Sequence, residues 1–421
     1  MAWTATTLGE ICDRVGGIIQ TGPFGSQLHQ SDYSEDGVPV VMPKDIIEGR
    51  IVKDGIACVT PEHVERLSRH KLKPGDIVYG RRGDIGRQAL IRKQQAGWIC
   101  GTGCLRLSLG DSVIDPIFLH YYLRKPDTIG WIANQAIGAT MPNLNTSILR
   151  SVPIRFPPHP IQRKISSILS AYDDLIENNL RRIKILEEMA QNLYREWFVK
   201  FRFPGHQHTR FTDSPQGRIP EGWEVKLLGN LADQIRDGVN PDSVDPETPY
   251  FGLEHLPRES ITLADWGFAS EVHSTKLLFK KGDILFGKIR PYFHKVGVAP
   301  LKGVCSSDTI VIRPKSTDCF GLVLGCTSSA EFVEHATATS QGTKMPRANW
   351  DVLVKYQVPM PCQPFLGQFN EFMYDIVNQL HNFVFRNQTL RRTRDLLLPR
   401  LISGEVDVSE LDISVSEEVD D

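Results

Sequence analysis

The sequence has no long hydrophobic run. No stretch approaches the roughly 20 consecutive apolar residues that span a bilayer, and the first residues have neither the basic region nor the apolar core of a secretory signal. The eight cysteines include no Cys-x2-Cys pair, and Cys100 and Cys104 have no His or Cys pair at the spacing that completes a zinc site. We therefore expect a cytoplasmic protein with reduced thiols, no membrane segment and no metal site.

Motifs of catalysis are also missing from the sequence. It contains no Asn/Asp-Pro-Pro-aromatic tetrapeptide of the adenine methyltransferase kind, no His-Glu-x-x-His and no Gly-x-Ser-x-Gly. Residues 282–288 fit the Gly-x4-Gly-Lys spacing of a phosphate-binding loop, but Ile289 follows them in place of the hydroxyl that ligates Mg²⁺. Because residues 284–286 also favour a strand, we expect no bound nucleotide and no catalytic residue in this chain.

The formal net charge of −2 hides an uneven distribution. Eight acidic residues and no basic residue follow Gly404, so residues 1–404 carry a net charge of about +6. This is weaker than the basic footprint of a protein that binds DNA alone. It fits a subunit that shares phosphate contacts with partners, although an ordinary globular protein could carry the same excess. We expect the acidic tail to be disordered or to contact a partner.

The chain repeats a series of short motifs at intervals of roughly 204 to 220 residues. Four motifs occur twice in the same order: Trp-x4-Leu-Gly (residues 3–9 and 223–229), Lys-x-Gly-Asp-Ile (73–77 and 280–284), Met-Pro (141–142 and 345–346) and Val-Pro (152–153 and 358–359). A protein built from two similar halves presents two similar surfaces. This organisation suits a target with two parts better than it suits a single catalytic cleft.

A long amphipathic segment follows the last motif of each half. Apolar residues recur at steps of three and four from Ile161 to Trp197 and from Phe365 to Leu397, which is the period of a coiled-coil seam. Prolines precede both segments, where a helix entry tolerates them. Each predicted helix has roughly 40 residues and is about 60 Å long. The simplest arrangement packs the two helices antiparallel with one globular domain near each end, and the alternative packs each helix on its own half.

Asparagines lie close to both predicted seams. Asn387 falls near the seam of the second helix, and Asn178 and Asn179 lie beside the seam of the first. A polar residue in a seam can fix the register of two helices at some cost in stability. The alternative is that these side chains are simply solvated.

The sequence predicts an α+β fold with an internal pseudo-two-fold repeat. Two similar mixed α/β domains are joined by two long antiparallel coiled-coil helices, because short β-rich runs punctuated by glycine and proline fill both halves. We predict these segments: a first globular domain (1–157), a first spacer helix (158–203), a linker (204–219), a second globular domain (220–360), a second spacer helix (361–403) and an acidic tail (404–421).

Together these features resemble the specificity subunit of Type I restriction-modification enzymes. The resemblance rests on the order and duplication of the four motifs and of the long helices, and it covers the chain up to about Leu401. It implies that each globular unit is a target recognition domain that reads one half of a split DNA sequence, and that the helices form a spacer and a dock for methyltransferase subunits. The family often has Glu-Gln at the helix entries, whereas Ile161 precedes Gln162 and Gly367 precedes Gln368 here.

Basic loops after strands are the natural places for DNA contacts, because sequence readout needs side chains at base edges together with cations and amides at phosphates. Phe24 and Trp131 could stack on DNA, but core packing is the favoured interpretation for both. For the first domain we predict DNA contacts by Gly22, Phe24, Ser26, Arg81, Arg82, Thr140, Asn143 and Asn145. For the second domain we predict contacts by Lys288, Arg290, Gln341, Lys344 and Arg347. The alternative for each cation is a solvated surface charge.

We therefore expect a DNA-binding subunit without chemistry of its own. The resemblance implies double-stranded DNA, two methyltransferase subunits and restriction or motor subunits as partners. It implies no cofactor in this chain, whereas the partner subunits would use S-adenosylmethionine, ATP and Mg²⁺. A different class of function also fits the long helices, namely a coiled-coil adaptor that binds proteins and has no sequence preference on DNA. An enzyme is disfavoured by the missing motifs.

Overall fold

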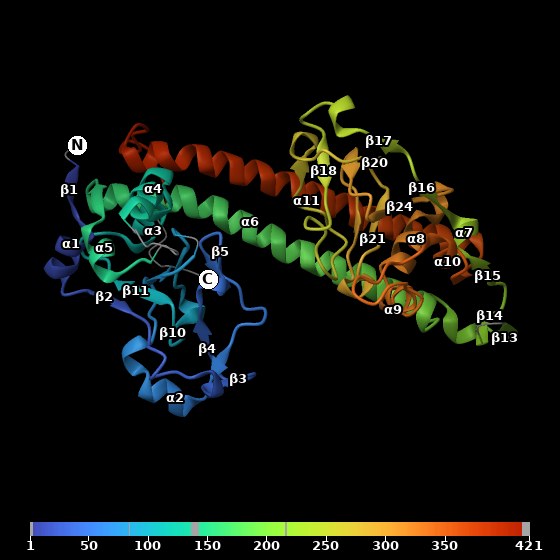
Figure 1. Ribbon diagram of the computed structural model, residues 1–421, viewed down its shortest axis with the longest axis horizontal. Helices are drawn as coiled ribbons and strands as arrows, with labels where there is room; N and C mark the ends of the chain where they lie inside the picture. The colour runs from blue at the N-terminus through green and yellow to red at the C-terminus, as the bar shows by residue number, and fades with distance from the viewer. Residues whose placement is uncertain (1–2, 84, 136–142, 215–216, 415–421) are drawn as a thin grey trace. The chain divides into compact units, whose positions relative to one another are not determined.

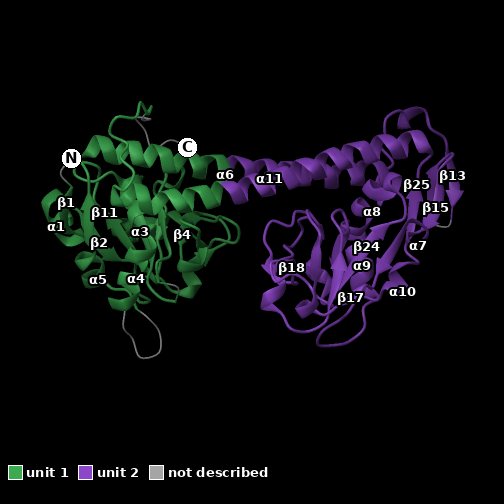
Figure 2. Ribbon diagram, turned by 90° about the horizontal axis from the view of Figure 1, so that it is seen from above, with its two compact units in different colours: residues 1–175, 390–421 green, residues 176–389 purple. Residues whose placement is uncertain are grey.

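The computed structural model describes residues 3–83, 85–135, 143–214 and 217–414 (Figure 1). The chain divides into two compact units, unit 1 (residues 1–175 and 390–421) and unit 2 (residues 176–389), as Figure 2 shows. Helices α6 (His159–Tyr194) and α11 (Gln363–Ser403) each contribute residues to both units. The predicted class, with two mixed domains and a pair of long helices, is confirmed. The predicted domain boundaries stay predictions.

Unit 1 is built on short strands and five short helices within its described residues. The strands are β1 (Thr4–Thr7), β2 (Ile18–Thr21), β3 (Tyr33–Ser34), β4 (Val38–Val41), β5 (Ile46–Ile47), β6 (Arg50–Ile51), β7 (Cys58–Val59), β8 (Ile77–Gly80), β9 (Gln88–Leu90), β10 (Ile99–Cys100), β11 (Cys104–Ser108) and β12 (Pro153–Phe156). The helices are α1 (Leu8–Val15), α2 (Pro61–Arg66), α3 (Pro116–Arg124), α4 (Pro126–Gln135) and α5 (Thr146–Ser151).

Unit 2 has the same kinds of element. Its strands are β13 (Phe211–Ser214), β14 (Gly217–Pro220), β15 (Glu224–Leu227), β16 (Ala232–Ile235), β17 (Gly238–Val239), β18 (Pro249–Phe251), β19 (Gly267–Phe268), β20 (Lys276–Phe279), β21 (Ile284–Gly287), β22 (Val296–Val298), β23 (Gly303–Cys305), β24 (Thr309–Pro314) and β25 (Gln357–Met360). Its short helices are α7 (Leu228–Leu231), α8 (Phe320–Thr327), α9 (Ala330–Ala338) and α10 (Trp350–Leu353).

The two units share one strand topology. The sheet β2-β11-β8-β9 of unit 1 corresponds to β16-β24-β21-β22 of unit 2, and all neighbours in both sheets are antiparallel. The antiparallel pair β1-β12 corresponds to β15-β25. Each unit also has one parallel pair, β4 with β10 and β18 with β23. The repeat that the sequence indicates is therefore a repeat of the fold.

The repeated Leu-Gly motif marks a close approach of two segments. The Leu8 N–H donates to the Val152 carbonyl at 3.0 Å, and in unit 2 the Leu228 N–H donates to the Tyr356 carbonyl at 2.8 Å. Both leucines are fully buried. A Cβ atom on Gly9 would lie only 2.9 Å from the backbone oxygen of Arg150. Glycine is therefore required here for packing space.

The repeated Gly-Asp-Ile motif is a strand entry in both units. Gly75 and Gly282 have φ values of 84° and 86°, a left-handed conformation that glycine adopts without strain. The carboxylate of Asp76 accepts the Lys73 N–H at 2.9 Å, and Asp283 closes the same turn in unit 2. The strands that follow alternate between two faces, since Ile77 and Tyr79 enter one hydrophobic cluster and Val78 enters another.

The long helices run antiparallel in each unit and also pack on its globular part. In unit 2, Phe369 of α11 lies 4.6 Å from Phe198 and 6.4 Å from Tyr194, measured between ring centroids. In unit 1, Ile165 and Leu169 of α6 share a buried cluster with Leu401 of α11 and with helix α3. Each long helix thus packs both on the other helix and on the globular part of the unit, because its apolar stripe contacts both. Both packing alternatives are therefore realised.

The asparagines near the seam of unit 2 form a buried pair. The Asn179 amide donates to Asn387 Oδ1 at 2.8 Å, and both side chains are almost fully buried. The alternative of solvated asparagines is therefore wrong for this pair. The amide nitrogen of Asn387 is buried without a partner among the described residues, which costs free energy. A displaced register would raise this cost further, because it would separate the pair. That the pair sets the register stays a prediction.

The helix entry of unit 1 is organised by Gln162. Its side chain is fully buried, accepts the Asp115 N–H at 2.7 Å and donates to the Pro157 carbonyl at 2.9 Å. In unit 2 the residue that binds the start of the corresponding short helix is Asn370, whose oxygen accepts the Gly321 N–H at 2.8 Å. Gln368 is exposed. The contact between the long helix and the start of the short helix is therefore made by Gln162 in unit 1 and by a different residue, Asn370, in unit 2.

The described part of the acidic tail packs on unit 1. Val408 is buried, and Lys164 Nζ donates to the carbonyl oxygens of Ser409 and Leu411 at 2.7 and 2.8 Å. The expected disorder is therefore wrong for residues 405–414, because two valines and a lysine that the composition did not weigh anchor this segment. The alternative, a contact with a partner, stays a prediction. Among the described residues, no helix is long and apolar enough to cross a membrane.

A buried charge cluster joins α3, α6 and α11 in unit 1. The Asp173 carboxylate pairs with Arg394 and with Arg124 (3.4 Å) and accepts the Tyr121 hydroxyl at 2.7 Å. Burial raises the pKa of Asp173, but the charges of Arg124 and Arg394 and the bonds from Tyr121 and Arg394 outweigh burial and lower the pKa to about 2. The ionised form of Asp173 therefore stabilises the folded unit.

The substitution Asp173→Asn should lower the free energy of unfolding by roughly 3 kcal/mol at pH 7, because it leaves a buried arginine without its counter-ion. The folded-state pKa lies below the unfolded value of about 3.9, so this stabilisation is present above pH 4 and is lost as the pH falls towards 2. Urea denaturation at a series of pH values between 2.5 and 7 measures it. Asp127→Asn, at an exposed pair with Lys125, is the control. A wild-type advantage that stays constant down to pH 2.5 contradicts the assignment.

Candidate nucleic-acid interface

The first candidate surface lies at the end of strand β8 in unit 1. The backbone of Arg81 is held on both sides, because its N–H donates to the Gly103 carbonyl at 2.8 Å and its carbonyl accepts the Leu144 N–H at 2.9 Å. Arg81 Nε donates to Asn143 Oδ1 at 3.1 Å, and Arg82 pairs with Asn143 as an isolated bridge. The structure therefore brings together three predicted contact residues from two distant segments.

The loop after β2 lies against the segment that contains Gly103, which also binds the backbone of Arg81. The Gly22 N–H donates to the Cys104 carbonyl at 2.9 Å, and a Cβ atom on Gly22 would lie 2.0 Å from the carbonyl oxygen of Gly101. Only glycine fits this approach of two backbones. Phe24 is 60% exposed and Ser26 is also exposed. The favoured core packing of Phe24 is therefore wrong, and its ring is free to contact a ligand.

Other predicted residues of unit 1 have different positions. Asn145 is the N-cap of α5, and its Oδ1 accepts the Ile148 N–H at 2.8 Å. The cap uses the amide oxygen as an acceptor and leaves the amide nitrogen of this exposed residue as a donor, so its contact with DNA stays a prediction. Trp131 packs partly buried against the core, as favoured. Thr140 lies outside the described residues.

The second candidate surface occupies the equivalent place at the end of β21 in unit 2. The Lys288 N–H donates to the Asp308 carbonyl at 3.0 Å, and the Lys288 carbonyl accepts the Ala348 N–H at 2.9 Å. Ile289 pairs with Arg347 as an isolated bridge, just as Arg82 pairs with Asn143 in unit 1. Two predicted residues, Lys288 and Arg347, are thus brought together on this surface.

The remaining predicted residues of unit 2 differ in how they are held. The backbone of Gln341 pairs with Arg347 through two hydrogen bonds of 2.8 and 3.1 Å, and Lys344, in the turn that they close, is exposed. Arg290 has a φ of 51°, and its guanidinium lies 5.8 Å from the centre of the Phe293 ring. The Arg290 Nε atom is buried without a partner in the part of the chain that the structure describes. Arg290 is therefore less available to a ligand than Lys344.

A cavity of about 510 Å³ opens at this end of unit 2. Its lining includes Lys288, Ser307, Gln341, Arg347, Asn349 and Arg236. Lys288 Nζ donates to the Ser307 carbonyl at 2.7 Å. The Nζ of Lys288 and the Nη2 of Arg347 both lie 3.7 Å from Asp308 Oδ1. The cavity is thus bordered by two cations that share one carboxylate.

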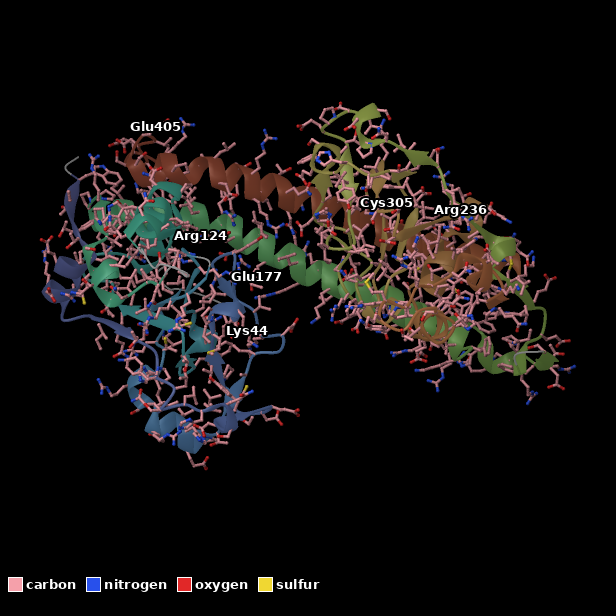
Figure 3. The ribbon with its side chains drawn as sticks, in the orientation of Figure 1. Lys44, Arg124, Glu177, Arg236, Cys305 and Glu405 are labelled. Atoms are coloured by element: carbon pink, nitrogen blue, oxygen red, sulfur yellow. The ribbon has the colours of Figure 1, made fainter. Side chains whose placement is uncertain are left out.

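Sequence reasoning missed Asp308 and Arg236. Arg236 is exposed (Figure 3) and follows β16 as Gly22 follows β2 in unit 1. Asp308 precedes β24 as Gly103 precedes β11. The carbonyl of each accepts the backbone N–H of the basic residue that follows the neighbouring strand. Cys100 stands three residues before Gly103, and Cys305 stands three residues before Asp308. This weak sequence similarity between the two segments could have located Asp308. Arg236 is recognisable only once the strand pairing is known.

The two surfaces share a backbone frame and differ in side chains. Three equivalent positions are Arg81, Gly103 and Asn143 in unit 1 and Lys288, Asp308 and Arg347 in unit 2. Unit 1 combines one cation with a neutral amide. Unit 2 combines two cations with a carboxylate. The same fold therefore offers two different patterns of hydrogen-bond donors and acceptors at the same place.

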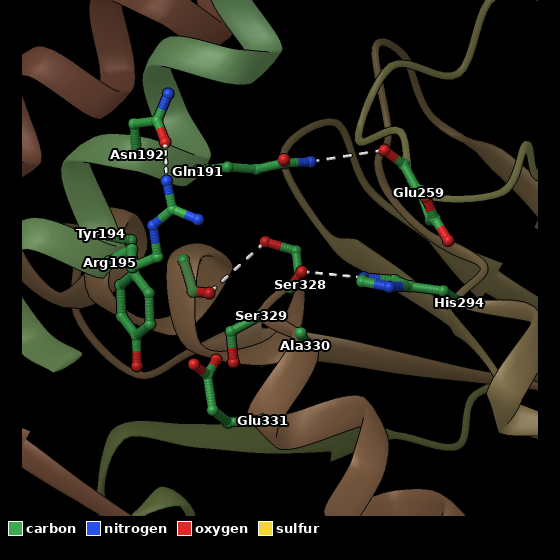
Figure 4. Close-up of a pocket in the computed structure, with 11 residues that line it drawn as sticks. Gln191, Asn192, Tyr194, Arg195, Glu259, His294, Ser328, Ser329, Ala330 and Glu331 are labelled. Atoms are coloured by element: carbon green, nitrogen blue, oxygen red, sulfur yellow. Dashed lines mark hydrogen bonds between the residues drawn. The ribbon is translucent and has the colours of Figure 1, made fainter.

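A further cavity of about 380 Å³ in unit 2 joins α6 to the start of α9 (Figure 4). Several of its polar groups are paired. His294 Nε2 lies 2.9 Å from the Ser328 carbonyl, Gln191 donates to the Glu259 carbonyl at 3.3 Å, and Arg195 donates to Asn192. The bond from Gln191 to Glu259 holds α6 to a loop of the globular part of unit 2.

Two buried thiols and the possible metal ligands give no candidate site in the described part of the chain. Burial raises the pKa of Cys100 and of Cys305 to about 12, so these thiols stay protonated. No group of three His, Cys, Asp or Glu side chains that could hold a metal ion occurs among the described residues. The cationic ends of β8 and β21 remain the candidate functional sites.

Replacing both Arg81 and Lys288 by alanine should weaken DNA binding, because both are cations held in equivalent places by backbone hydrogen bonds. The slope of log affinity against log salt should become shallower by about 0.9 for each phosphate contact that is lost. Fluorescence anisotropy with a labelled duplex at several salt concentrations measures both quantities. Arg218→Ala, at an exposed cation on β14, is the matched control. Affinity and slope equal to those of the wild type exclude these sites.

Comparison with known proteins identifies the chain's relatives. Residues 2–188 match the family model described as Type I restriction modification DNA specificity domain. The chain is 26% identical over 394 residues to the Type I restriction enzyme MjaIX specificity subunit of Methanocaldococcus jannaschii, covering 90% of this chain and 89% of the relative. It is 21% identical to the HindI specificity subunit of Haemophilus influenzae, covering 80% of this chain and 88% of the relative.

The fold has a match among solved structures. The crystal structure of the Type I restriction-modification S subunit from M. genitalium aligns over 95% of this chain and 96% of its own, with a TM-score of 0.60 and 16% sequence identity. The family model covers the first half, the curated relatives extend over both halves, and the solved structure has the same fold. Residues 2–188 thus match the DNA specificity domain of Type I restriction-modification systems, and the chain is similar over most of its length to the specificity subunits of such systems.

Proposed function

We propose that this chain recognises a bipartite DNA sequence in which two unlike half-sites are separated by a fixed non-specific gap. The observation that carries the proposal is the shared backbone frame with different side chains at three equivalent positions. One frame with two donor and acceptor patterns suits two different short sequences, because base identity is read through the arrangement of donors and acceptors in the major groove. The gap then follows from the length of α6 and α11, as dimer geometry sets half-site spacing in other DNA-binding proteins.

The chain directs partner subunits to this target and performs no chemistry itself. The partners are two methyltransferase subunits, which use S-adenosylmethionine to methylate adenine, and restriction or motor subunits, which use ATP and Mg²⁺. The complex acts on double-stranded DNA in the cytoplasm. The burial of the thiols Cys100 and Cys305, which keeps them protonated, supports a role in binding over a role in catalysis. The modest basic excess of residues 1–404 supports sharing of phosphate contacts with partners.

The proposal is tested by mapping modified adenines in a host that lacks adenine methylation. The chain is co-expressed with a methyltransferase subunit with which it forms a soluble complex, and the genome is read by single-molecule sequencing. We expect one bipartite motif with a constant gap, which disappears when this chain is omitted or when the methyltransferase is inactivated. Methylation without a motif, or none despite a soluble complex, contradicts the proposal and favours a coiled-coil adaptor.

A further inference from the structure

A carboxylate lies in the middle of the cationic surface of unit 2. Asp308 precedes β24, its side chain is 33% exposed, and both Lys288 and Arg347 approach it. A carboxylate repels phosphate, so Asp308 weakens any contact of this surface with the DNA backbone. A contact with phosphate therefore does not explain why Asp308 lies among residues that are proposed to bind DNA.

The backbone of Asp308 is held rigidly. Its carbonyl accepts the Lys288 N–H at 3.0 Å, its N–H donates to Ser306 Oγ at 3.2 Å, and the Thr309 N–H closes the turn on the Ser306 carbonyl at 3.0 Å. Thr309 itself is almost fully buried in β24. Groups that read DNA bases discriminate best when the scaffold fixes them in place. The anchored turn fixes the backbone from which the carboxylate projects.

The neighbouring cations do not use up the capacity of the carboxylate. Both nitrogen atoms lie 3.7 Å from Oδ1, which is beyond hydrogen-bond distance. The Lys288 ammonium donates instead to the Ser307 carbonyl at 2.7 Å. An ionised carboxylate has about four acceptor positions. Asp308 thus keeps acceptors for a donor that comes from outside the protein.

Two donors of this kind exist in the major groove, the N4 amino group of cytosine and the N6 amino group of adenine, whereas guanine and thymine present acceptors there. We propose that Asp308 determines part of the specificity of unit 2 by accepting a hydrogen bond from the exocyclic amino group of a cytosine or adenine. This rests on the proposed function. Lys288 and Arg347 flank the carboxylate and lower the cost of bringing it close to DNA.

Unit 1 lacks this acceptor. The equivalent position is Gly103, which has a φ of 85° and no side chain, and the nearby Asn143 already accepts from Arg81. The contact is therefore confined to one half of the target. The two units differ in which base property they can select at this place, even though their backbones are equivalent.

The substitution Asp308→Asn tests this inference because it keeps the shape, removes the charge and adds a donor. Adenine modification by the full complex is mapped for the wild type and the variant. We expect one position in one half-site to change from a single base to several, with the preference for the original base reduced roughly 10- to 100-fold. The other half-site and the gap should stay as they are. Arg81→Ala, which affects unit 1, shows which half-site belongs to which unit.

Asp318→Asn is the matched control. Asp318 is an exposed aspartate of unit 2 whose N–H also donates to a serine Oγ two residues earlier at 3.2 Å, but the cations Lys288 and Arg347 approach Asp308 instead. Its motif should equal that of the wild type. If Asp308→Asn lowers methylation evenly and leaves the motif unchanged, Asp308 only orients the neighbouring cations and the inference is overturned. If the wild type yields no bipartite motif, the proposed function itself fails.

A second measurement covers a variant that methylates too little DNA to give a motif. The wild-type and Asp308→Asn complexes are bound to duplexes in which single cytosines or adenines of the unit 2 half-site carry analogues without the amino group. At one position the analogue should weaken wild-type binding roughly 10- to 100-fold and leave binding by the variant unchanged. The base at that position shows whether cytosine or adenine is read. Equal losses in both complexes at every position overturn the inference.

Discussion

The fold depends on the burial of one apolar stripe on each of two long helices. A helix of this length cannot bury its own stripe, and helical stability in proteins comes mostly from tertiary packing of the apolar face. In each unit the stripes of α6 and α11 are covered by one another and by short helices and strands. The helix pair therefore belongs to one large buried cluster in each unit, whereas further clusters of the globular parts form without it. Each candidate surface is built on a sheet that has one face in the cluster of the helices.

Buried polar contacts join the two helices beside the apolar stripes. The Asn179–Asn387 and Asp173–Arg394 pairs form in the observed alignment of the helices, and a shift of the register would separate them. In unit 2, Glu187 of α6 adds a contact to the globular part, because its Oε1 accepts the Thr262 N–H at 3.0 Å and the Thr262 hydroxyl at 2.7 Å. Such contacts orient each sheet on the helices, so the loops at the strand ends have a defined direction.

Much of the fold follows from the sequence because its signals are local. The Leu-Gly and Gly-Asp-Ile motifs specify tight approaches and turns within a few residues, and the step of three and four residues identifies the helices directly. The meeting of Arg81 with Asn143 was also predictable in outline, since the repeat aligns both with residues of unit 2. The burial of Val408 was not predictable, because an acidic composition conceals a single apolar anchor.

The rest of the candidate site depends on strand pairing, which a single sequence does not give. Asp308 and Arg236 matter because β24 pairs with both β21 and β16, so that all three strands belong to one sheet, and neither residue has a distinctive local motif. Asn145 was predicted to contact DNA, and the structure shows that its oxygen also caps a helix. Arg290 was predicted to contact DNA together with Lys288, yet its backbone has a left-handed conformation and its guanidinium lies over Phe293. Exposure and direction of a side chain are tertiary properties.

We propose that the lengths of the two long helices set the gap between the two half-sites. Inserting one heptad into both α6 and α11, at the borders between the units, preserves the seam and lengthens each helix by about 10 Å. Adenine modification mapped for this variant should show the same two half-sites with a gap longer by about three base pairs, at roughly 3.4 Å per pair. An unchanged gap with both half-sites still recognised would contradict the account.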